Sequence, residues 1–280
     1  MAEQKIAILG GGGMLGTDLA SECSRRGIGF EVFDLPDFNI TNEQHLREAM
    51  DGAAAVINCA AYTNVEKAES EPEQAYKVNA EAVGTLGSLV QQAGVWVLHI
   101  STDFVFDGNS ERPYTETDTP NPINIYGKSK LAGEKLLVES GCQYCIMRLE
   151  WTYGLSGNNF VKKLIEFAKK KQELDVVDDQ VGSPTATPQA AKAICELLSK
   201  RPVGVFHFAA EGYVSRFDMA KFIFDKLGMI VDLNRCKSSD YLCKAQRPLN
   251  SRFCCDKIKA LLNEPIDYWQ GPLEDFLRKL

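Results

Sequence analysis

The residues Lys5-Ile-Ala-Ile-Leu-Gly-Gly-Gly-Gly-Met-Leu-Gly16 decide the fold of this 280-residue chain. A short apolar run, typical of a buried β-strand, ends in a glycine-rich turn, and a helical pattern follows through Arg26. The glycines at positions 10, 13 and 16 let the backbone approach a pyrophosphate, and the helix N-terminus adds N–H donors and a positive dipole. The stretch therefore predicts the first strand and phosphate-binding turn of a dinucleotide-binding fold.

Strand and helix patterns keep alternating after this unit. Strands are predicted at 30–33, 53–59, 96–100, 144–149 and 205–209. Helices are predicted at 43–50, 73–93, 189–200 and 217–227, and two more are expected, one that begins at 126 and another that ends at 171. Such alternation favours a parallel sheet with helices on both faces. We predict an α/β fold, a Rossmann-type doubly wound parallel sheet with a smaller C-terminal substrate-binding subdomain. The dinucleotide-binding domain is expected at 1–150, with returning elements from about 187–228, and the subdomain at 151–186 and 229–280.

Composition narrows the functional classes. The formal net charge is −7 and no long Lys/Arg block is present, which argues against nucleic-acid binding. No run of 18 apolar residues occurs, and the N-terminal residues lead directly into a predicted strand, so we expect neither a membrane span nor a signal peptide. Nine scattered cysteines suit a reducing compartment. We expect a cytoplasmic protein.

The cysteines and histidines that could in principle bind a metal are expected to have structural roles. Cys142 and Cys145 have the spacing of half a zinc site, but no second Cys or His pair stands at ligand spacing. We therefore expect packing roles for both thiols and no metal site. His99 and His207 lie inside apolar strand patterns, where structural roles are expected as well.

Tyr126-Gly-Lys-Ser-Lys130 carries the predicted chemistry, together with Ser101-Thr102-Asp103 at the end of a predicted strand. If Tyr126 begins a helix, Lys130 lies one turn away on the same face. An ammonium at that position should lower the pKa of the phenol, so that the tyrosine can act as an acid or base. Thr102 would hold a substrate oxygen against the phenol.

Charge and shape suggest further ligand contacts. Asp34, at the end of the second strand, can accept hydrogen bonds from ribose hydroxyls and would repel a 2′-phosphate, which favours NADH. Trp151 offers a flat face for a sugar or a base. Arg247 and Arg252 are candidate partners of a diphosphate by charge complementarity.

Ordered motifs along most of the chain closely resemble the dTDP-4-dehydrorhamnose reductases, a family of extended short-chain dehydrogenases/reductases. The motifs are 10–16, 58–69, Ser101-Thr-Asp-Phe-Val-Phe-Asp-Gly108, Tyr126-Gly-Lys-Ser-Lys-Leu-Ala-Gly-Glu134, Arg148-x-x-Trp151-x-Tyr-Gly154, Asn159-Phe160 and Asp179-Gln-x-Gly-x-Pro-Thr185. The resemblance implies NADH- or NADPH-dependent reduction of a 4-keto sugar nucleotide, the last step to dTDP-L-rhamnose.

The resemblance and the residue chemistry together name the expected site. The catalytic residues are Thr102, Tyr126 and Lys130. The cofactor residues are Gly10, Gly13, Met14, Leu15, Gly16, Asp34, Asn39, Ile40, Ala60, Ala61, Tyr62, Thr63, Tyr126 and Lys130. The substrate residues are Thr63, Thr102, Asp103, Phe104, Tyr126, Trp151 and Arg247. The expected partner is a dTDP-linked sugar, bound by a monomer or a homodimer.

Two departures and two alternatives accompany the resemblance. Asn39 stands where an Asp is common, and Pro188-Gln189 occupies a position where some members use an acid to bind a bridging magnesium, so that metal site is not carried over. The chain could instead reduce another 4-keto sugar nucleotide. It could also serve as a non-catalytic subunit similar to the regulatory subunit of methionine adenosyltransferase, although Trp151 favours an enzyme.

Overall fold

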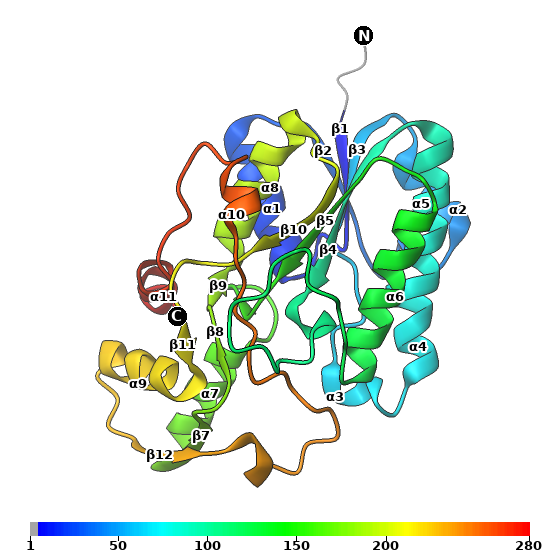
Figure 1. The fold of residues 1–280 in the computed structure, drawn as a ribbon. Coiled ribbons are helices and arrows are strands. Elements are labelled where there is room, and N and C mark those ends of the chain that lie inside the picture. Colours follow the sequence, from blue (N-terminus) through cyan, green and yellow to red (C-terminus); the bar gives the residue numbers. More distant parts are fainter. Residues whose placement is uncertain (1–4) are drawn as a thin grey trace.

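The structure, a computed structural model, describes residues 5–280 (Figure 1). The start of the predicted first domain and the N-terminal residues used to predict the absence of a signal peptide lie outside the described part. Within residues 5–280, every helix is too short or too polar to cross a lipid bilayer.

A six-stranded parallel sheet forms the centre of the molecule, with the order β10-β5-β4-β3-β1-β2. Its strands are β1 (Lys5–Leu9), β2 (Phe30–Phe33), β3 (Ala53–Asn58), β4 (Trp96–Thr102), β5 (Tyr144–Leu149) and β10 (Gly204–Phe208). From β1 the chain steps to β2 on one side and then returns to build β3, β4, β5 and β10 on the other side. The winding therefore reverses between β1 and β3, a place where ligands bind in open α/β sheets. The predicted doubly wound α/β fold is confirmed.

Helices cover both faces of this sheet (Figure 1). On one face lie α1 (Met14–Arg26) and α8 (Thr187–Lys200), whose Leu19 and Ile194 are fully buried in one hydrophobic core. On the other face lie α2 (Glu43–Met50), α4 (Pro72–Tyr76), α5 (Ala82–Ala93) and α6 (Ile125–Glu139). A π-helical turn, η1 (Lys77–Glu81), lies between α4 and α5, so the helix predicted at 73–93 is present as one helical run that changes to π geometry in its middle.

A second, smaller hydrophobic core lies beyond one end of the sheet and includes Trp151, Leu164, Ile223 and Trp269. It is built from α7 (Phe160–Lys170), β7 (Glu173–Val177), α9 (Arg216–Leu227), β12 (Asp232–Cys236) and α11 (Gln270–Leu277), which gather at the lower left of Figure 1. The connecting elements are α3 (Val65–Ala68), η2 (Asp103–Val105), β6 (Thr152–Tyr153), β8 (Val181–Gly182), β9 (Thr185–Ala186), β11 (Val214–Ser215), η3 (Ser238–Asp240) and α10 (Asp256–Lys259).

Two segments pack in a different core from the one expected from the predicted domain limits. Helix α9 was assigned to the first domain, but its apolar face is buried in the second core. Conversely Ile258, on α10 in the segment assigned to the subdomain, is fully buried in the first core. We propose that the returning part of the first domain ends near residue 208, because β10 is the last strand of the sheet.

Candidate active site

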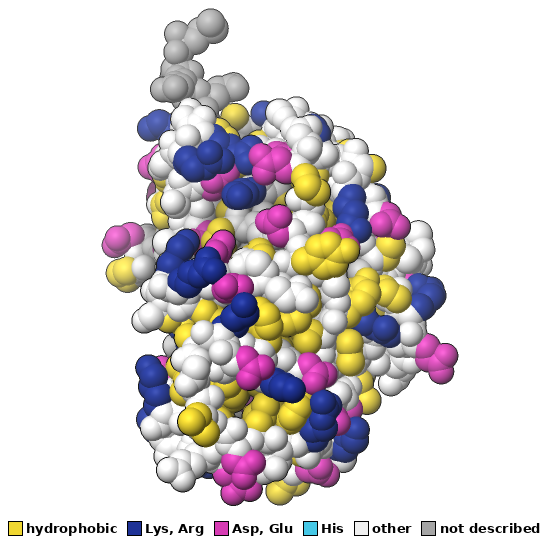
Figure 2. Space-filling view, turned by 90° about the vertical axis from the view of Figure 1, so that its left-hand side faces the viewer, with side chains coloured by type: hydrophobic (Ala, Val, Ile, Leu, Met, Phe, Trp, Pro, Cys, Tyr) yellow, Lys and Arg dark blue, Asp and Glu magenta, His cyan; other side chains and the backbone are white. Residues whose placement is uncertain are grey.

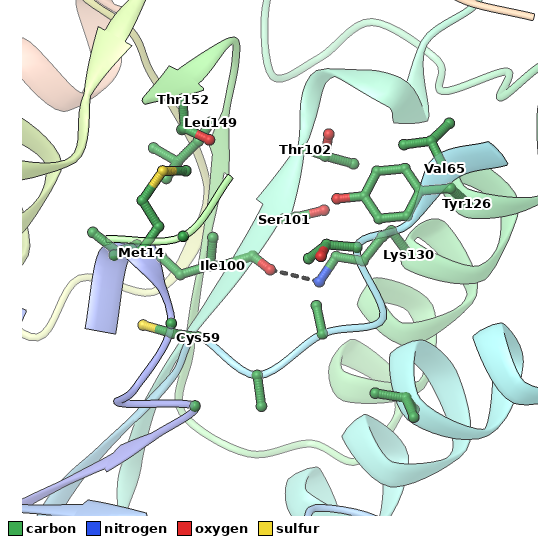
Figure 3. Close-up of a pocket in the computed structure, with 18 of the residues that line it drawn as sticks. Met14, Cys59, Val65, Ile100, Ser101, Thr102, Tyr126, Lys130, Leu149 and Thr152 are labelled. Carbon is green, nitrogen blue, oxygen red and sulfur yellow. Dashed lines mark hydrogen bonds between the residues drawn. The ribbon is translucent and has the colours of Figure 1, made fainter. Parts of the chain in front are cut away.

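A cavity of about 690 Å³ opens at the carboxyl ends of β1, β3 and β4, beside the reversal of the sheet (Figure 3). It brings together most of the residues predicted from the sequence. These are Gly10, Gly13, Met14, Leu15, Asp34, Asn39, Ile40, Ala60, Ala61, Thr63, Thr102, Asp103, Phe104, Tyr126, Lys130 and Trp151. Three predicted residues, Gly16, Tyr62 and Arg247, do not line the cavity.

The glycine turn is shaped by close backbone contacts. Gly10 has a φ of +73°, and a Cβ there would lie 2.6 Å from the Ala60 nitrogen. A Cβ on Gly16 would lie 2.4 Å from the Gly10 carbonyl oxygen, so this residue permits tight packing of α1 rather than ligand contact. Gly13 precedes α1 and has no side chain to cap it, which leaves N–H groups of the first helical turn free for an anion.

Asp34 is tied to this turn. One carboxylate oxygen accepts a hydrogen bond from the Gly12 N–H at 2.6 Å, and the other accepts from the Leu35 N–H at 2.8 Å. The carboxylate therefore lies against the glycine turn and faces the cavity, as the predicted ribose contact requires. Its bonds to two backbone amides also hold it in place.

The segment after β3 divides its roles. Ala60, Ala61 and Thr63 line the cavity, whereas the Tyr62 hydroxyl donates to a Glu71 carboxylate oxygen at 2.8 Å. The Tyr62 N–H donates to the side-chain oxygen of Asn79, which the π turn presents. The predicted cofactor contact of the Tyr62 side chain is therefore not seen, because the side chain turns toward the helices.

Packing of α6 delivers the predicted catalytic residues. The side chain of Asn124 caps the helix by accepting from the Gly127 N–H, and Tyr126 lies in the first turn. A Cβ on Gly127 would be 2.0 Å from the Phe104 carbonyl oxygen, so glycine is needed for α6 to approach the end of β4. In Figure 3 the Tyr126 phenol oxygen points toward Ser101 and Thr102.

A buried ion pair fixes α6 to the sheet. Glu134 on α6 makes two hydrogen bonds with Arg148 on β5, and both side chains are almost completely buried. The Ser101 hydroxyl donates to the same carboxylate. A helix held by a bidentate, charge-assisted pair presents Tyr126 and Lys130 in a fixed position.

Lys130 and Tyr126 interact differently from the sequence-based expectation. The Lys130 side-chain nitrogen donates to the Ile100 carbonyl oxygen at 2.7 Å and lies 3.2 Å from His99 Nε2 (Figure 3 shows the first bond). Burial raises the pKa of Tyr126 to about 12, while the Thr102 hydroxyl acts in the opposite direction. The expected lowering of the tyrosine pKa by Lys130 is therefore wrong for this state, because the amine is directed to β4 and desolvation of the half-buried phenol has the larger effect.

His99 is part of this site, although the sequence suggested only a structural role. The Asn58 side-chain oxygen accepts from the Ala60 N–H, so its amide nitrogen faces His99 Nδ1 at 3.0 Å as a donor. The His99 proton then resides on Nε2, directed at Lys130. Burial lowers the pKa of Lys130 to about 8, and an uncharged amine can accept that hydrogen bond while donating to Ile100.

Two buried acids lie beside Thr102. Asp103 accepts hydrogen bonds from Thr102 at 3.0 Å and from Ser251 at 2.6 Å, and burial raises its pKa to about 6. Glu150 is completely buried, and neither carboxyl oxygen has a hydrogen-bond partner among residues 5–280. Burial, and then repulsion from Asp103, raise the pKa of Glu150 well above its ordinary value.

Trp151 lines the cavity but is only 9% exposed, with a φ of 43°. The Arg216 guanidinium carbon lies 3.4 Å from the centroid of the Trp151 ring. A cation therefore covers one face of the ring that was expected to contact a sugar or a base. Arg216 itself lines the cavity and was not predicted. It follows the N-cap residue of α9, and no motif connects it to Trp151 in the sequence.

The arginines predicted to bind a diphosphate are engaged elsewhere. Arg247 makes an ion pair with Glu66 at 2.7 Å. Arg252 donates to the Asn250 side chain and to the Glu111 carbonyl oxygen. Neither residue lines the cavity, so the structure does not place their charges where they were expected.

Comparisons with known proteins point to one family. Residues 4–280 match the family described as RmlD substrate binding domain. The chain is 39% identical over 236 residues to dTDP-4-dehydrorhamnose reductase of Escherichia coli K12, which covers 80% of this chain and 79% of that protein. The same-named protein of Aggregatibacter actinomycetemcomitans is 36% identical over 97% of both chains. A crystal structure of dTDP-4-dehydrorhamnose reductase from Bacillus anthracis in complex with NADP is 34% identical and superposes with a TM-score of 0.94, covering 99% and 100% of the two chains.

Proposed function

Because the chain belongs to the dTDP-4-dehydrorhamnose reductase family, a family of NAD(P)H-dependent oxidoreductases, we propose that it reduces the 4-keto group of dTDP-4-dehydro-6-deoxy-L-mannose to form dTDP-L-rhamnose. The observation that carries this proposal is the shared cavity, in which Thr102, Tyr126 and Lys130 lie beside the glycine turn. A hydroxyl, a phenol and an amine at a nucleotide-binding turn supply what a carbonyl reduction needs from a protein.

The described residues fit a nicotinamide dinucleotide. A side chain at Gly10 or Gly16 would collide with the backbone of Ala60 or of the turn itself, so these glycines keep the turn compact. The start of α1 then offers free N–H donors to a diphosphate. Asp34 would bind the adenosine ribose, and Ala60, Ala61 and Thr63 would border the remainder. When bound, the reduced nicotinamide supplies the hydride that reaches the carbonyl carbon.

Tyr126 acts as the general acid in this proposal. With its pKa raised to about 12, the phenol is protonated at neutral pH and can deliver its proton to the developing alkoxide. Thr102, at the end of β4, holds the carbonyl oxygen against the phenol. Lys130 orients the cofactor ribose, and with its pKa lowered to about 8 the amine can gain or lose a proton near neutral pH.

The proposed function also includes a ligand, an oligomeric state and a cellular location. The dTDP-sugar is the expected ligand, bound beside Thr63, Thr102, Asp103, Phe104 and Trp151. A monomer or a homodimer, and a cytoplasmic location, remain predictions.

The test is oxidation of NADH and NADPH with dTDP-4-keto-6-deoxy-L-mannose, with the stereochemistry at C4 of the product read by NMR. Formation of dTDP-L-rhamnose supports the proposal. Turnover of a different 4-keto sugar nucleotide, but not of this one, would assign the alternative substrate. Absence of turnover with all such substrates would favour the non-catalytic subunit.

A further inference from the structure

We propose that Arg216 is a specificity-determining residue that binds the diphosphate of the sugar nucleotide from the second core of the molecule. This inference rests on the proposed function and deepens it by naming the group that recognises the charged part of the substrate.

Positive charge is scarce in the cavity. Among the described residues that line it, Lys130 and Arg216 carry the only basic side chains, and Asp34 and Asp103 carry acidic ones. Lys130 is directed to Ile100 and His99. A dianionic ligand in a chain with a net charge of −7 needs a local cation, and Arg216 is the one left to supply it.

The charge of Arg216 is not neutralised within the protein. No ion pair or side-chain hydrogen bond of Arg216 is found among residues 5–280, and the charged groups near enough to influence its pKa are Asp103, Arg247 and Glu150. Both oxygens of Asp103 already accept hydrogen bonds from Thr102 and Ser251. Glu150 favours its neutral form. A partly buried guanidinium without a carboxylate partner is less stable than a paired one, and an anionic ligand in the cavity would supply the missing partner.

Two aromatic rings hold the guanidinium in place. Its central carbon lies 3.4 Å from the Trp151 ring centroid and 4.5 Å from that of Phe160. Stacking uses the faces of the guanidinium and leaves its in-plane N–H groups to bind phosphate oxygens in a bidentate manner. Because the rings fix the side chain in advance, less conformational entropy is lost on binding.

The position of Arg216 favours the substrate over the cofactor as the source of the phosphate. Arg216 lies on α9 beside Trp151 and near enough to Asp103 to be influenced by its charge, on the side of the cavity that carries Thr102. The glycine turn and the N-terminus of α1, which would bind the cofactor diphosphate, belong to β1 and its first crossover. The two phosphate sources can be separated by titration.

Isothermal titration calorimetry of the full chain and of Arg216→Gln, with dTDP, dTMP, thymidine and NADPH as probes, tests the inference without requiring turnover. We expect the Kd for dTDP to rise about 10- to 100-fold, because a charge-assisted bidentate contact is lost. The loss should shrink for dTMP and vanish for thymidine and NADPH. Arg235→Gln is the matched control: Arg235 also stacks on an aromatic ring, Phe217, but is paired with Asp178 and Asp218.

Arg216→Lys provides a second variant that keeps the charge but lacks the planar donors, and it should weaken dTDP binding by about severalfold. An unchanged dTDP affinity in a folded Arg216→Gln protein would overturn the inference, as would a loss confined to NADPH or a wild-type chain that does not bind dTDP. If Arg216→Gln does not fold, unchanged dTDP affinity in Arg216→Lys decides against it. A wild type that binds dTDP through Arg216 but reduces no keto sugar would refute the proposed function alone.

Discussion

The phenol of Tyr126 is the group whose removal should most directly affect chemistry. Tyr126→Phe deletes the proton donor and keeps the ring that packs edge-on against Phe104. General acid catalysis contributes about 10²–10⁴-fold, so kcat should fall by about that factor with little change in cofactor affinity. Steady-state kinetics and a cofactor titration check both parts. Near-normal turnover would refute the assignment of Tyr126 as the acid.

Lys130 is predicted to support turnover and to bind the cofactor ribose, and one substitution tests both roles when turnover and cofactor affinity are measured separately. Lys130→Met removes the amine that donates to Ile100 and faces His99, and with it the predicted contact to the cofactor ribose. We expect slower turnover together with weaker binding of NADPH, measured by fluorescence titration. The matched control is Lys128→Met, two residues away on the exposed face of α6. Slow turnover with unchanged cofactor affinity would contradict the ribose contact.

The sequence predicted which residues form the site better than it predicted where their side chains point. Tyr126 and Lys130 could be found because both lie within one short motif on one helix. The effect of Lys130 on the Tyr126 pKa could not be predicted, since it depends on the Ile100 carbonyl and on the burial of the phenol. Arg216 was missed because its contact with Trp151 joins positions 65 residues apart in the chain.

Among the elements, the glycine turn between β1 and α1 is connected to the end of β2 through Asp34, and this connection can be tested. Asp34→Ala removes a carboxylate that accepts from the Gly12 and Leu35 amides and faces the cavity. The carboxylate should disfavour a 2′-phosphate by about 1 kcal/mol or more, so we predict a wild-type preference for NADH of up to roughly tenfold, lost in the variant.

Comparison of kcat/KM for NADH and NADPH in both proteins checks this prediction. The variant should also bind both cofactors more weakly, because the turn loses two hydrogen bonds. A wild-type preference for NADPH, or an unchanged ratio in Asp34→Ala, would mean that the carboxylate serves the turn alone.

The elements themselves show where pattern-based prediction ends. The sheet strands were predicted to within a few residues because each contains a short run rich in apolar residues. The π turn Lys77–Glu81 was not predicted, since the hydrophobic period continues through it. The turn contains Asn79, whose side chain bonds the Tyr62 backbone and Ser129. Two-residue strands such as β6 and β9 carry too few positions for any period.

For the whole molecule, the interesting feature is how the two cores meet around the cavity. Asp103 follows the last strand residue of β4, and its carboxylate accepts from Ser251 in the C-terminal segment. The domain limits predicted from the sequence could not show this joint, because the C-terminal segment returns to the sheet through contacts with no local signature. Tyr114 and Phe253, both buried in the first core, are paired between two distant segments of the chain and show the same long-range dependence.

The acid at this joint should affect stability in a pH-dependent way. The pKa of Asp103 is raised to about 6 in the folded chain, above its ordinary value of 3.8. Between these values the unfolded chain has lost the proton and the folded chain retains it, so this group makes the protein less stable as pH rises from about 4 to about 6. The shift corresponds to a loss of up to about 3 kcal/mol.

Asp103→Asn should abolish this loss, because an amide accepts from Ser251 without ionising. Urea unfolding from pH 4 to pH 8 measures the difference in free energy of unfolding between the variant and the wild type. We expect it to shift in favour of the variant by up to about 3 kcal/mol between pH 4 and pH 7, and then to stay level. Asp107→Asn is the control: although burial acts to raise it, hydrogen bonds led by that from the Asn109 N–H keep the pKa of Asp107 below its ordinary value. Its shift should therefore have the opposite sign and occur below about pH 4, so the difference for Asp107→Asn should stay level across the pH 4–8 range. A difference for Asp103→Asn that is constant across pH 4–7 would show that Asp103 ionises as an ordinary acid, and that the joint between the cores is open to water.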